Sequence, residues 1–124
     1  MSLKIDLHEE TIKMAVLRIE GSLDTSTYLL LERKVDQVLQ GDVSVMVFDL
    51  QKVDYISSAG IRVILKAQKV LKKRNGKISL IHLQPQVKKT LDFINALPSL
   101  NALPTEELDF YLDRIQRETA EKKD

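Results

Sequence analysis

The chain has 124 residues, of which 44% are hydrophobic and 30% charged, and its 19 Lys and Arg nearly balance its 18 Asp and Glu, for a net charge of +1. We expect one soluble globular domain over residues 1–124, since this is enough apolar material for a core. Near-neutrality gives no general attraction for nucleic acid or anionic membranes. The lack of Cys excludes disulfides, thiol catalysis and Cys-based metal sites, and no segment approaches the roughly 20 apolar residues of a membrane span. We therefore expect a cytoplasmic protein without metal or cofactor.

The first two predicted strands form a hairpin. Residues 3–7 alternate between apolar and polar side chains, which is the period of a strand, and residues 12–19 alternate again with a shift of phase after Val16. The phase shift predicts a bulge, or burial on both faces of the strand. Polar residues 8–10 separate the two runs, so we expect the turn there.

A helix, a buried strand and a second helix follow. Apolar residues recur at helical spacing over 28–38, and Gly41 is a suitable stop. Residues 43–48 are almost continuously apolar and rich in β-branched side chains, as in a strand covered on both faces. A second helix is predicted over 58–74, ended by the Asn-Gly pair at 75–76.

The remaining residues predict two further helices. Residues 78–83 form the next strand, and a short third helix starts at Pro85. Residues 101–103 predict a short edge strand. A C-terminal helix over 104–117 follows, with Thr105 as its N-cap, and we expect residues 118–124 to be a charged, frayed tail.

The predicted order is therefore β-β-α-β-α-β-α-(β)-α. The strand–helix–strand unit over 43–83 implies parallel pairing through a right-handed crossover. These elements predict an α/β fold with a mixed, mostly parallel sheet and helices packed mainly on one side.

The main candidate site is the segment Asp-Tyr-Ile-Ser-Ser-Ala-Gly at 54–60. Turns at the carboxyl ends of parallel strands are where open sheets place functional groups, and the small residues beside Ser57 and Ser58 predict unshielded hydroxyls. On local chemistry alone, the simpler interpretation is that one Ser caps the following helix. The alternative is phosphorylation, because free N–H groups and the helix dipole stabilise a phosphate at a helix N-terminus.

Other polar residues give weaker signals. Asp24, in the polar segment 21–27, is placed to cap the helix that follows. Four further titratable residues were weighed for an enzyme site: His8, Asp49, Asp54 and His82. Their spacing matches no metal-ligand pattern, and no Gly-rich phosphate loop is present, so the sequence does not predict catalysis.

Four segments together resemble a known family. They are Ile-Glu-Gly-Ser-Leu-Asp at 19–24, the strand at 45–50, Val-Asp-Tyr-Ile-Ser-Ser-Ala-Gly-Ile at 53–61, and Leu-Pro-Thr-Glu-Glu at 103–107. The third is the most specific, since it is similar to a D-S-[ST]-G phosphorylation motif in its S-S-A-G form. Over nearly its whole length the chain resembles the STAS domains of bacterial anti-sigma factor antagonists.

The resemblance implies partner switching rather than enzymatic activity. Such an antagonist binds an anti-sigma factor that is also a serine kinase, is released when the kinase phosphorylates it, and is reset by a PP2C-like phosphatase. By position Ser58 matches the phosphoacceptor, with Ser57 the second choice. Ser57 stands where many members have Asp, and Ala59, before Gly60, stands where many have Ser or Thr. Asp24 matches the acidic residue beside the acceptor.

Two alternatives stay open at this level. The chain could be a STAS scaffold or regulatory module of a stress-sensing, transporter or chemosensory system. It could also be a small nucleotide-binding protein or enzyme built on the turn at 54–60. For the antagonist, Arg62, Lys66 and Lys69 are predicted to form part of the partner surface, and the simpler interpretation of these three is a solvated helix face.

Overall fold

The computed structural model describes residues 2–11 and 13–121. Its elements are, in chain order, β1 (Lys4–Thr11), β2 (Met14–Leu23), α1 (Tyr28–Leu39), β3 (Val45–Ile56), α2 (Ser58–Lys73), β4 (Lys77–Ile81), α3 (Pro85–Ala96), the 3-10 helix η1 (Leu100–Ala102) and α4 (Thr105–Glu121).

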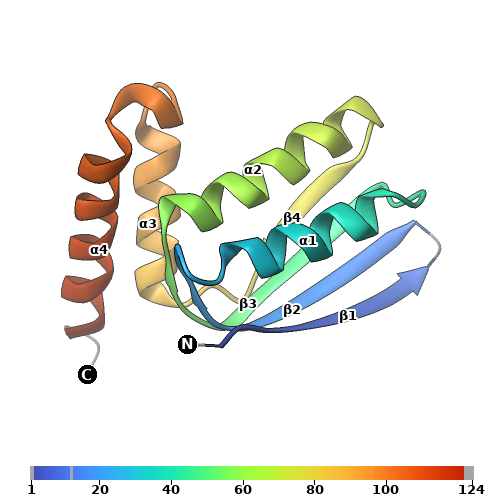
Figure 1. The fold of residues 1–124 in the computed structure, drawn as a ribbon, viewed down its shortest axis with the longest axis horizontal. Helices are drawn as coiled ribbons and strands as arrows, with labels where there is room; N and C mark the ends of the chain where they lie inside the picture. The colour runs from blue at the N-terminus through green and yellow to red at the C-terminus, as the bar shows by residue number, and fades with distance from the viewer. Residues whose placement is uncertain (1, 12, 122–124) are drawn as a thin grey trace.

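The strands form one sheet in the order β1-β2-β3-β4. The β1–β2 pair is antiparallel, whereas β2–β3 and β3–β4 are parallel. In Figure 1 α1 and α2 cover one face of this sheet, and α3 and α4 pack on each other beyond its end. The mixed, mostly parallel sheet predicted from the sequence is thus confirmed.

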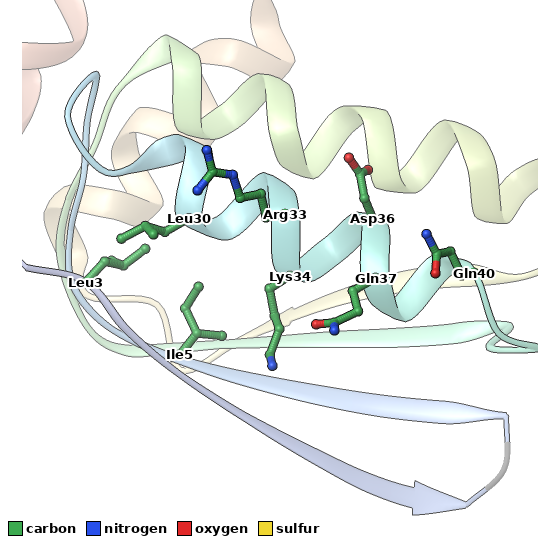
Figure 2. Close-up of a pocket in the computed structure, with 8 residues that line it drawn as sticks. All are labelled: Leu3, Ile5, Leu30, Arg33, Lys34, Asp36, Gln37 and Gln40. Carbon is green, nitrogen blue, oxygen red and sulfur yellow. The ribbon is translucent and has the colours of Figure 1, made fainter.

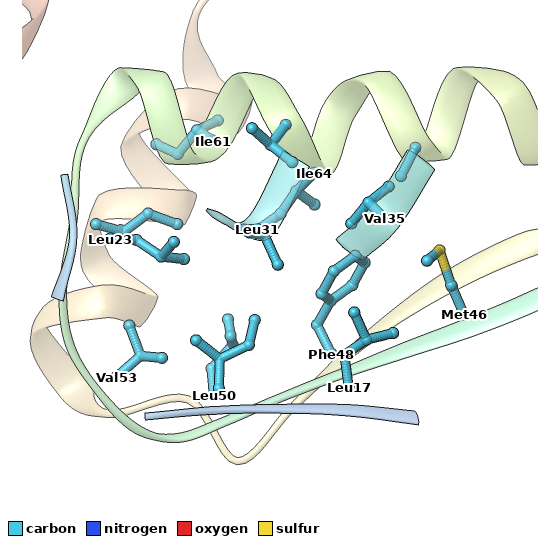
Figure 3. Close-up of a cluster of buried hydrophobic side chains, with 14 of the residues drawn as sticks. Leu17, Leu23, Leu31, Val35, Met46, Phe48, Leu50, Val53, Ile61 and Ile64 are labelled. Atoms are coloured by element: carbon cyan, nitrogen blue, oxygen red, sulfur yellow. The ribbon is translucent and has the colours of Figure 1, made fainter. Parts of the chain in front are cut away.

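The core lies between the sheet and the helix pair α1–α2. Leu31 of α1 and Ile61 of α2 face Leu17 and Phe48 of the two central strands, and all are at most 2% exposed (Figure 3). Ala15, Val16 and Leu17 of β2 are all buried, so the phase shift after Val16 reflects burial on both faces of the strand, and the register shifts of the β2–β3 pairing occur later, after Arg18. Burial of this apolar layer fixes the two central strands, and with them the loops at their carboxyl ends.

Three predictions about the secondary structure were wrong. Residues 8–10 belong to β1 instead of the hairpin turn, because β1 stays paired with β2 through Thr11. The edge strand expected at 101–103 is replaced by η1, since the N–H of Ala102 bonds the carbonyl of Ser99 at 3.1 Å and closes a local turn.

The third error concerns the end of the chain. The last helix continues to Glu121 instead of fraying after Arg117. Ion pairs between residues four apart, Arg114 with Glu118 and Arg117 with Asp113, support its final turns. Residues 118–121 of the expected tail are therefore helical, and 122–124 lie outside the described residues.

Candidate functional site

Two loops meet at the carboxyl ends of β2 and β3. The N–H of Ser57 bonds the carbonyl of Leu23 at 2.7 Å, and the Ser22 hydroxyl donates to the Asp54 carboxylate at 2.8 Å. The parallel pairing of β2 with β3 continues to the match of Leu23 with Ile56. The segments 21–27 and 54–60, which the sequence singled out separately, are therefore one site.

The two adjacent serines have different roles in this site. Ser57 is the N-cap of α2: its backbone is extended, and its hydroxyl oxygen accepts from the N–H of Gly60 at 3.4 Å. Ser58 is the first residue of α2, and it is one of the residues that line an open pocket of about 500 Å³, together with Ala59 and Arg62. The Ser57 hydroxyl thus caps the helix, whereas the Ser58 hydroxyl takes no part in the cap.

Gly60 allows α2 to approach the sheet closely. A Cβ at this position would lie 3.0 Å from the Cβ of Leu23 and 3.3 Å from Cγ1 of Ile56. Both neighbours are fully buried, so they have little room to move. The glycine of the Ser-Ser-Ala-Gly motif is thus explained by helix–strand packing.

Asp24 shapes the other loop. Its carboxylate accepts from the N–H of Ser26 at 2.9 Å and from the Ser26 hydroxyl at 2.7 Å, whereas α1 begins after Thr27 with no side-chain cap. Asp24 therefore stabilises the turn before α1 instead of capping the helix itself. Burial raises the pKa of Asp24, but the hydrogen bonds from Ser26 and Thr27 outweigh it and hold this pKa below its ordinary value of 3.8. The carboxylate is consequently ionised at neutral pH.

The serines are more shielded than the sequence predicts. Ser58 is only 1% exposed and Ser57 4%, although small neighbours suggested unshielded hydroxyls. The reason is tertiary, because Thr105 and Asp109 of α4 line the pocket beside Ser58. The expectation of an exposed serine was wrong.

Helix α4 bonds directly to the β3–α2 turn. Asp109 accepts from the N–H of Ser58 at 3.1 Å. The Gln116 side chain accepts from the N–H of Ile56 at 2.7 Å and donates to the carbonyl of the same residue at 2.9 Å. Gln116 is 3% exposed. These three bonds satisfy backbone groups that the end of a strand and the start of a helix would otherwise leave unpaired.

The sequence did not reveal this docking. The predicted apolar face of the last helix consisted of Leu108, Tyr111, Leu112 and Ile115. In the structure Leu108, Leu112 and Gln116 are buried and Tyr111 is 39% exposed. A spacing of four residues aligns Gln116 with the two leucines, which is the signal that could have placed it on the buried side.

Acidic residues of α4 also affect Tyr55, the residue before Ile56. Burial, the charges of Asp113 and Asp109, and a hydrogen bond with Asp113 raise the pKa of Tyr55 above its ordinary value of 10.0. The turn that carries the serines thus lies in a locally negative field.

The cations proposed for a partner surface lie along α2. Arg62 is half-buried and lines the Ser58 pocket together with Lys66. Lys66 also lies 3.8 Å from the Glu32 carboxylate and 3.5 Å from that of Asp36. Lys69 is exposed and is not among the residues that line this pocket.

The other titratable residues do not converge on one centre. Nδ1 of His82 lies 3.1 Å from the Asp49 carboxylate, Asp54 is bonded to Ser22, and His8 is on β1. Over residues 2–11 and 13–121, no cluster of His, Asp and Glu is placed to hold a metal ion. Within the same part of the chain, no helix is long and apolar enough to cross a membrane.

A second hollow lies between β1 and α1. Leu3 and Ile5 lie on its strand side, and Leu30, Arg33 and Lys34 lie on its helix side (Figure 2). Its lining mixes apolar, amide and charged side chains that do not form one cluster of polar groups. It shares no residue with the Ser58 pocket.

Comparison with known proteins identifies the family. Residues 5–108 match the model of the STAS domain, so the match ends within the first turn of α4. The chain is 33% identical over 93 residues to BtrV of Bordetella bronchiseptica, which its name assigns provisionally to the anti-sigma factor antagonists, with 72% of this chain and 79% of that protein covered. It is 26% identical over 93 residues to the anti-sigma F factor antagonist of Paenibacillus polymyxa, with 74% and 79% covered.

Solved structures share the fold. Unphosphorylated SpoIIAA, an anti-sigma factor antagonist, matches with a TM-score of 0.69 and 22% identity over 74% of this chain and 81% of that one. Phosphorylated SpoIIAA from Bacillus matches with 0.63 and 21% over 90% and 99%. An anti-sigma factor antagonist from Mycobacterium paratuberculosis matches with 0.67 and 18% over 96% and 95%. The chain belongs to the STAS domain family.

Proposed function

We propose that this chain is an anti-sigma factor antagonist that acts by partner switching in the cytoplasm, with Ser58 as its phosphoacceptor. The observation that carries the proposal is the difference in structural role between the two serines. Ser57 is used as the N-cap of α2, whereas Ser58 holds the motif position and lines a pocket. The names of the two curated relatives support the antagonist role.

In the proposed switch, the partner kinase catalyses the phosphorylation. A serine kinase supplies the base, the Mg²⁺ and the ATP, so the antagonist needs no base or metal of its own beside the hydroxyl. This explains how Ser58 can be functional with no catalytic triad around it, and the chain itself is proposed to catalyse no reaction. A PP2C-like phosphatase would remove the phosphate.

The charge of the phosphate is sufficient to break a complex. Phosphoserine adds about −1.5 to −2 charges, which changes the net charge of the chain from +1 to about zero or −1. A thousandfold loss of affinity requires about 4 kcal/mol. Burying the phosphate against a partner surface without matching donors readily costs this much. The ionised Asp24, in the adjoining loop, strengthens the local negative field.

The partner surface is proposed to include Arg62, Lys66 and Lys69 on α2. Arg62 and Lys66 line the same pocket as Ser58, so a partner seated on the turn would contact both. We expect Arg62→Glu to weaken binding of the anti-sigma factor at least tenfold in a titration. Lys88→Glu on α3, an exposed lysine paired with Asp92, is the matched charge reversal and should have no effect. Equal affinities of the two variants would remove this face from the interface.

The experiment for the proposed function is phosphosite mapping. The protein is purified from its own cells and analysed by intact-mass and peptide mass spectrometry, with Ser58→Ala and Ser57→Ala variants in parallel. We expect one phosphate on Ser58, lost in Ser58→Ala and kept in Ser57→Ala. Failure to find phosphate under any growth or stress condition would contradict the switch and favour a STAS scaffold. ATP binding by the isolated chain would favour the nucleotide-binding alternative.

A further inference from the structure

Helix α4 is seated on the Ser58 turn through one face. Asp109 and Gln116 are seven residues apart, about two helical turns, so they lie on the same side of the helix. Their side chains bond the backbone of Ser58 and of Ile56, the residues on either side of Ser57. Leu112, which lies between them on this side of the helix, is fully buried.

This seating restricts access to the phosphoacceptor. A kinase must bring its base to hydrogen-bond distance of the hydroxyl and align the γ-phosphate with it. Ser58 is 1% exposed, and Thr105 and Asp109 border the pocket beside it. The other wall includes residues of α1, whose Leu31 is part of the main core. Helix α4 lies beyond the end of the sheet (Figure 1). Its Leu108 and Leu112 belong to the same core as Leu31, so opening the turn must withdraw these two leucines from the core.

A phosphate on Ser58 would conflict with the seated helix. The N–H groups at the start of α2 are the natural partners of a phosphate there, and the N–H of Ser58 is already bonded to Asp109. The phosphate would therefore compete with the Asp109 carboxylate and repel it. Asp113 adds to this repulsion, since both carboxylates already raise the pKa of Tyr55.

We propose that α4 is a latch on the Ser58 turn, which shields the hydroxyl when it is closed and is released when Ser58 is phosphorylated. The contacts of Asp109 and Gln116 hold the latch closed. By linkage, whatever favours the open helix also favours phosphorylation. The release on phosphorylation rests on the proposed function of Ser58, whereas the shielding does not.

The shielding is tested with a thiol probe, because the chain contains no Cys. The Ser58→Cys variant carries a single thiol, whose reaction with Ellman's reagent is followed by absorbance. We expect the thiol to react at least tenfold faster when Gln116→Ala is added to Ser58→Cys. The same is expected when Asp109→Ala is added, a change that removes one hydrogen bond to the turn instead of two. Glu107→Gln, on the exposed side of α4, is the control and should change the rate less than twofold. Circular dichroism checks that each variant is folded. A Ser58→Cys thiol that reacts equally fast with and without these changes would overturn the shielding.

The release is tested on protein with phosphoserine incorporated at position 58 during translation, which requires no kinase. Hydrogen–deuterium exchange by mass spectrometry compares peptides of α4 with peptides of α1. We expect at least tenfold faster exchange in α4 and no change in α1, with the effect reduced by Asp109→Asn but not by Glu107→Gln. Unchanged exchange in α4, or equal acceleration in α1, would overturn the latch. Either result leaves the phosphosite mapping untouched, so failure of the latch is distinguishable from failure of the proposed function.

Discussion

The two ends of α2 are held in different ways. At its C-terminal end the Arg74 guanidinium donates to the carbonyls of Leu39, Gly41 and Val43 at 2.5 to 3.3 Å, and the N–H of Lys77 bonds the carbonyl of Ser44 at 2.8 Å. The Lys77 bond joins backbone to backbone, and the Arg74 side chain adds bonds to carbonyls at the end of α1 and in the segment that follows it.

At its N-terminal end the N–H of Ser57 bonds the backbone of Leu23, and the groups on either side of Ser57 depend on side chains of α4. Asp109 and Gln116 satisfy the backbone of Ser58 and Ile56 across 51 and 60 residues of sequence. An end built into the sheet opens only when the domain unfolds, whereas an end clamped by the last helix can open locally. The comparison thus separates a structural end of α2 from the end on which the proposed latch acts.

The largest effect is expected from Gly76→Ala, at the structural end. A Cβ at this position would lie 2.1 Å from the carbonyl oxygen of Ser44, and the backbone must shift to relieve the clash. We expect a loss of about 3 kcal/mol in the free energy of unfolding, measured in urea. Gly41→Ala is the control: its Cβ would meet nothing nearer than 3.6 Å, and its cost should stay within about 0.5 kcal/mol.

A smaller loss, of about 2 kcal/mol, is expected from Gln116→Ala, because it leaves the buried N–H and carbonyl of Ile56 without their partner. Its signature differs from that of Gly76→Ala: amide exchange should accelerate in α4 before it does in the sheet. Glu107→Ala on the exposed side of α4 should cost no more than about 0.5 kcal/mol. Uniform acceleration over the whole chain would contradict a locally opening end.

Arg74→Lys should cost about 1 kcal/mol in urea unfolding. The substitution keeps the charge but loses the planar fork that reaches three carbonyls, and the site is exposed to water, which limits the effect. Lys73→Arg, an exposed neighbour, serves as the reverse exchange and should be neutral. If Arg74→Lys were as stable as the parent chain, the fork would not hold this end.

The smallest effect concerns pH. The pKa of Tyr55 is raised in the folded chain, so folding favours the protonated phenol. That contribution is complete below the unfolded pKa of about 10 and is lost as pH rises through the folded pKa. Urea unfolding above pH 10 should therefore show a steeper loss of stability for the parent chain than for Tyr55→Phe. Equal slopes would mean that burial and the nearby Asp113 and Asp109 together do not disfavour the ionised phenol of Tyr55 in the folded chain.

The sheet and its covering helices were predictable because their signals are local. The helical stripe at 28–38 and the apolar run at 43–48 correspond to α1 and to most of the first half of β3. The Asn-Gly stop at 75–76 corresponds to the left-handed backbone of Asn75, whose φ is 58°. These features depend on periodicity and on backbone conformation, which the sequence expresses directly.

The seat of α4 was not predictable in the same way. The spacing of its leucines indicated a helix but not the surface on which it packs. Asp109 and Gln116 look like ordinary polar helix positions, because their partners are backbone groups 51 and 60 residues away. The positions of Ser57 and Ser58 were clear from the motif, whereas their burial depends on this long-range contact.

The most direct test of the contrast between the two ends of α2 is residue-resolved amide exchange by NMR in low concentrations of denaturant. The amides of Ile56 and Ser58 should exchange through a local opening whose free energy is lower than that of global unfolding and nearly independent of denaturant. Those of Gly76 and Lys77 should exchange only through global unfolding, with the full denaturant dependence. A single free energy and a single denaturant dependence for all four amides would contradict the account.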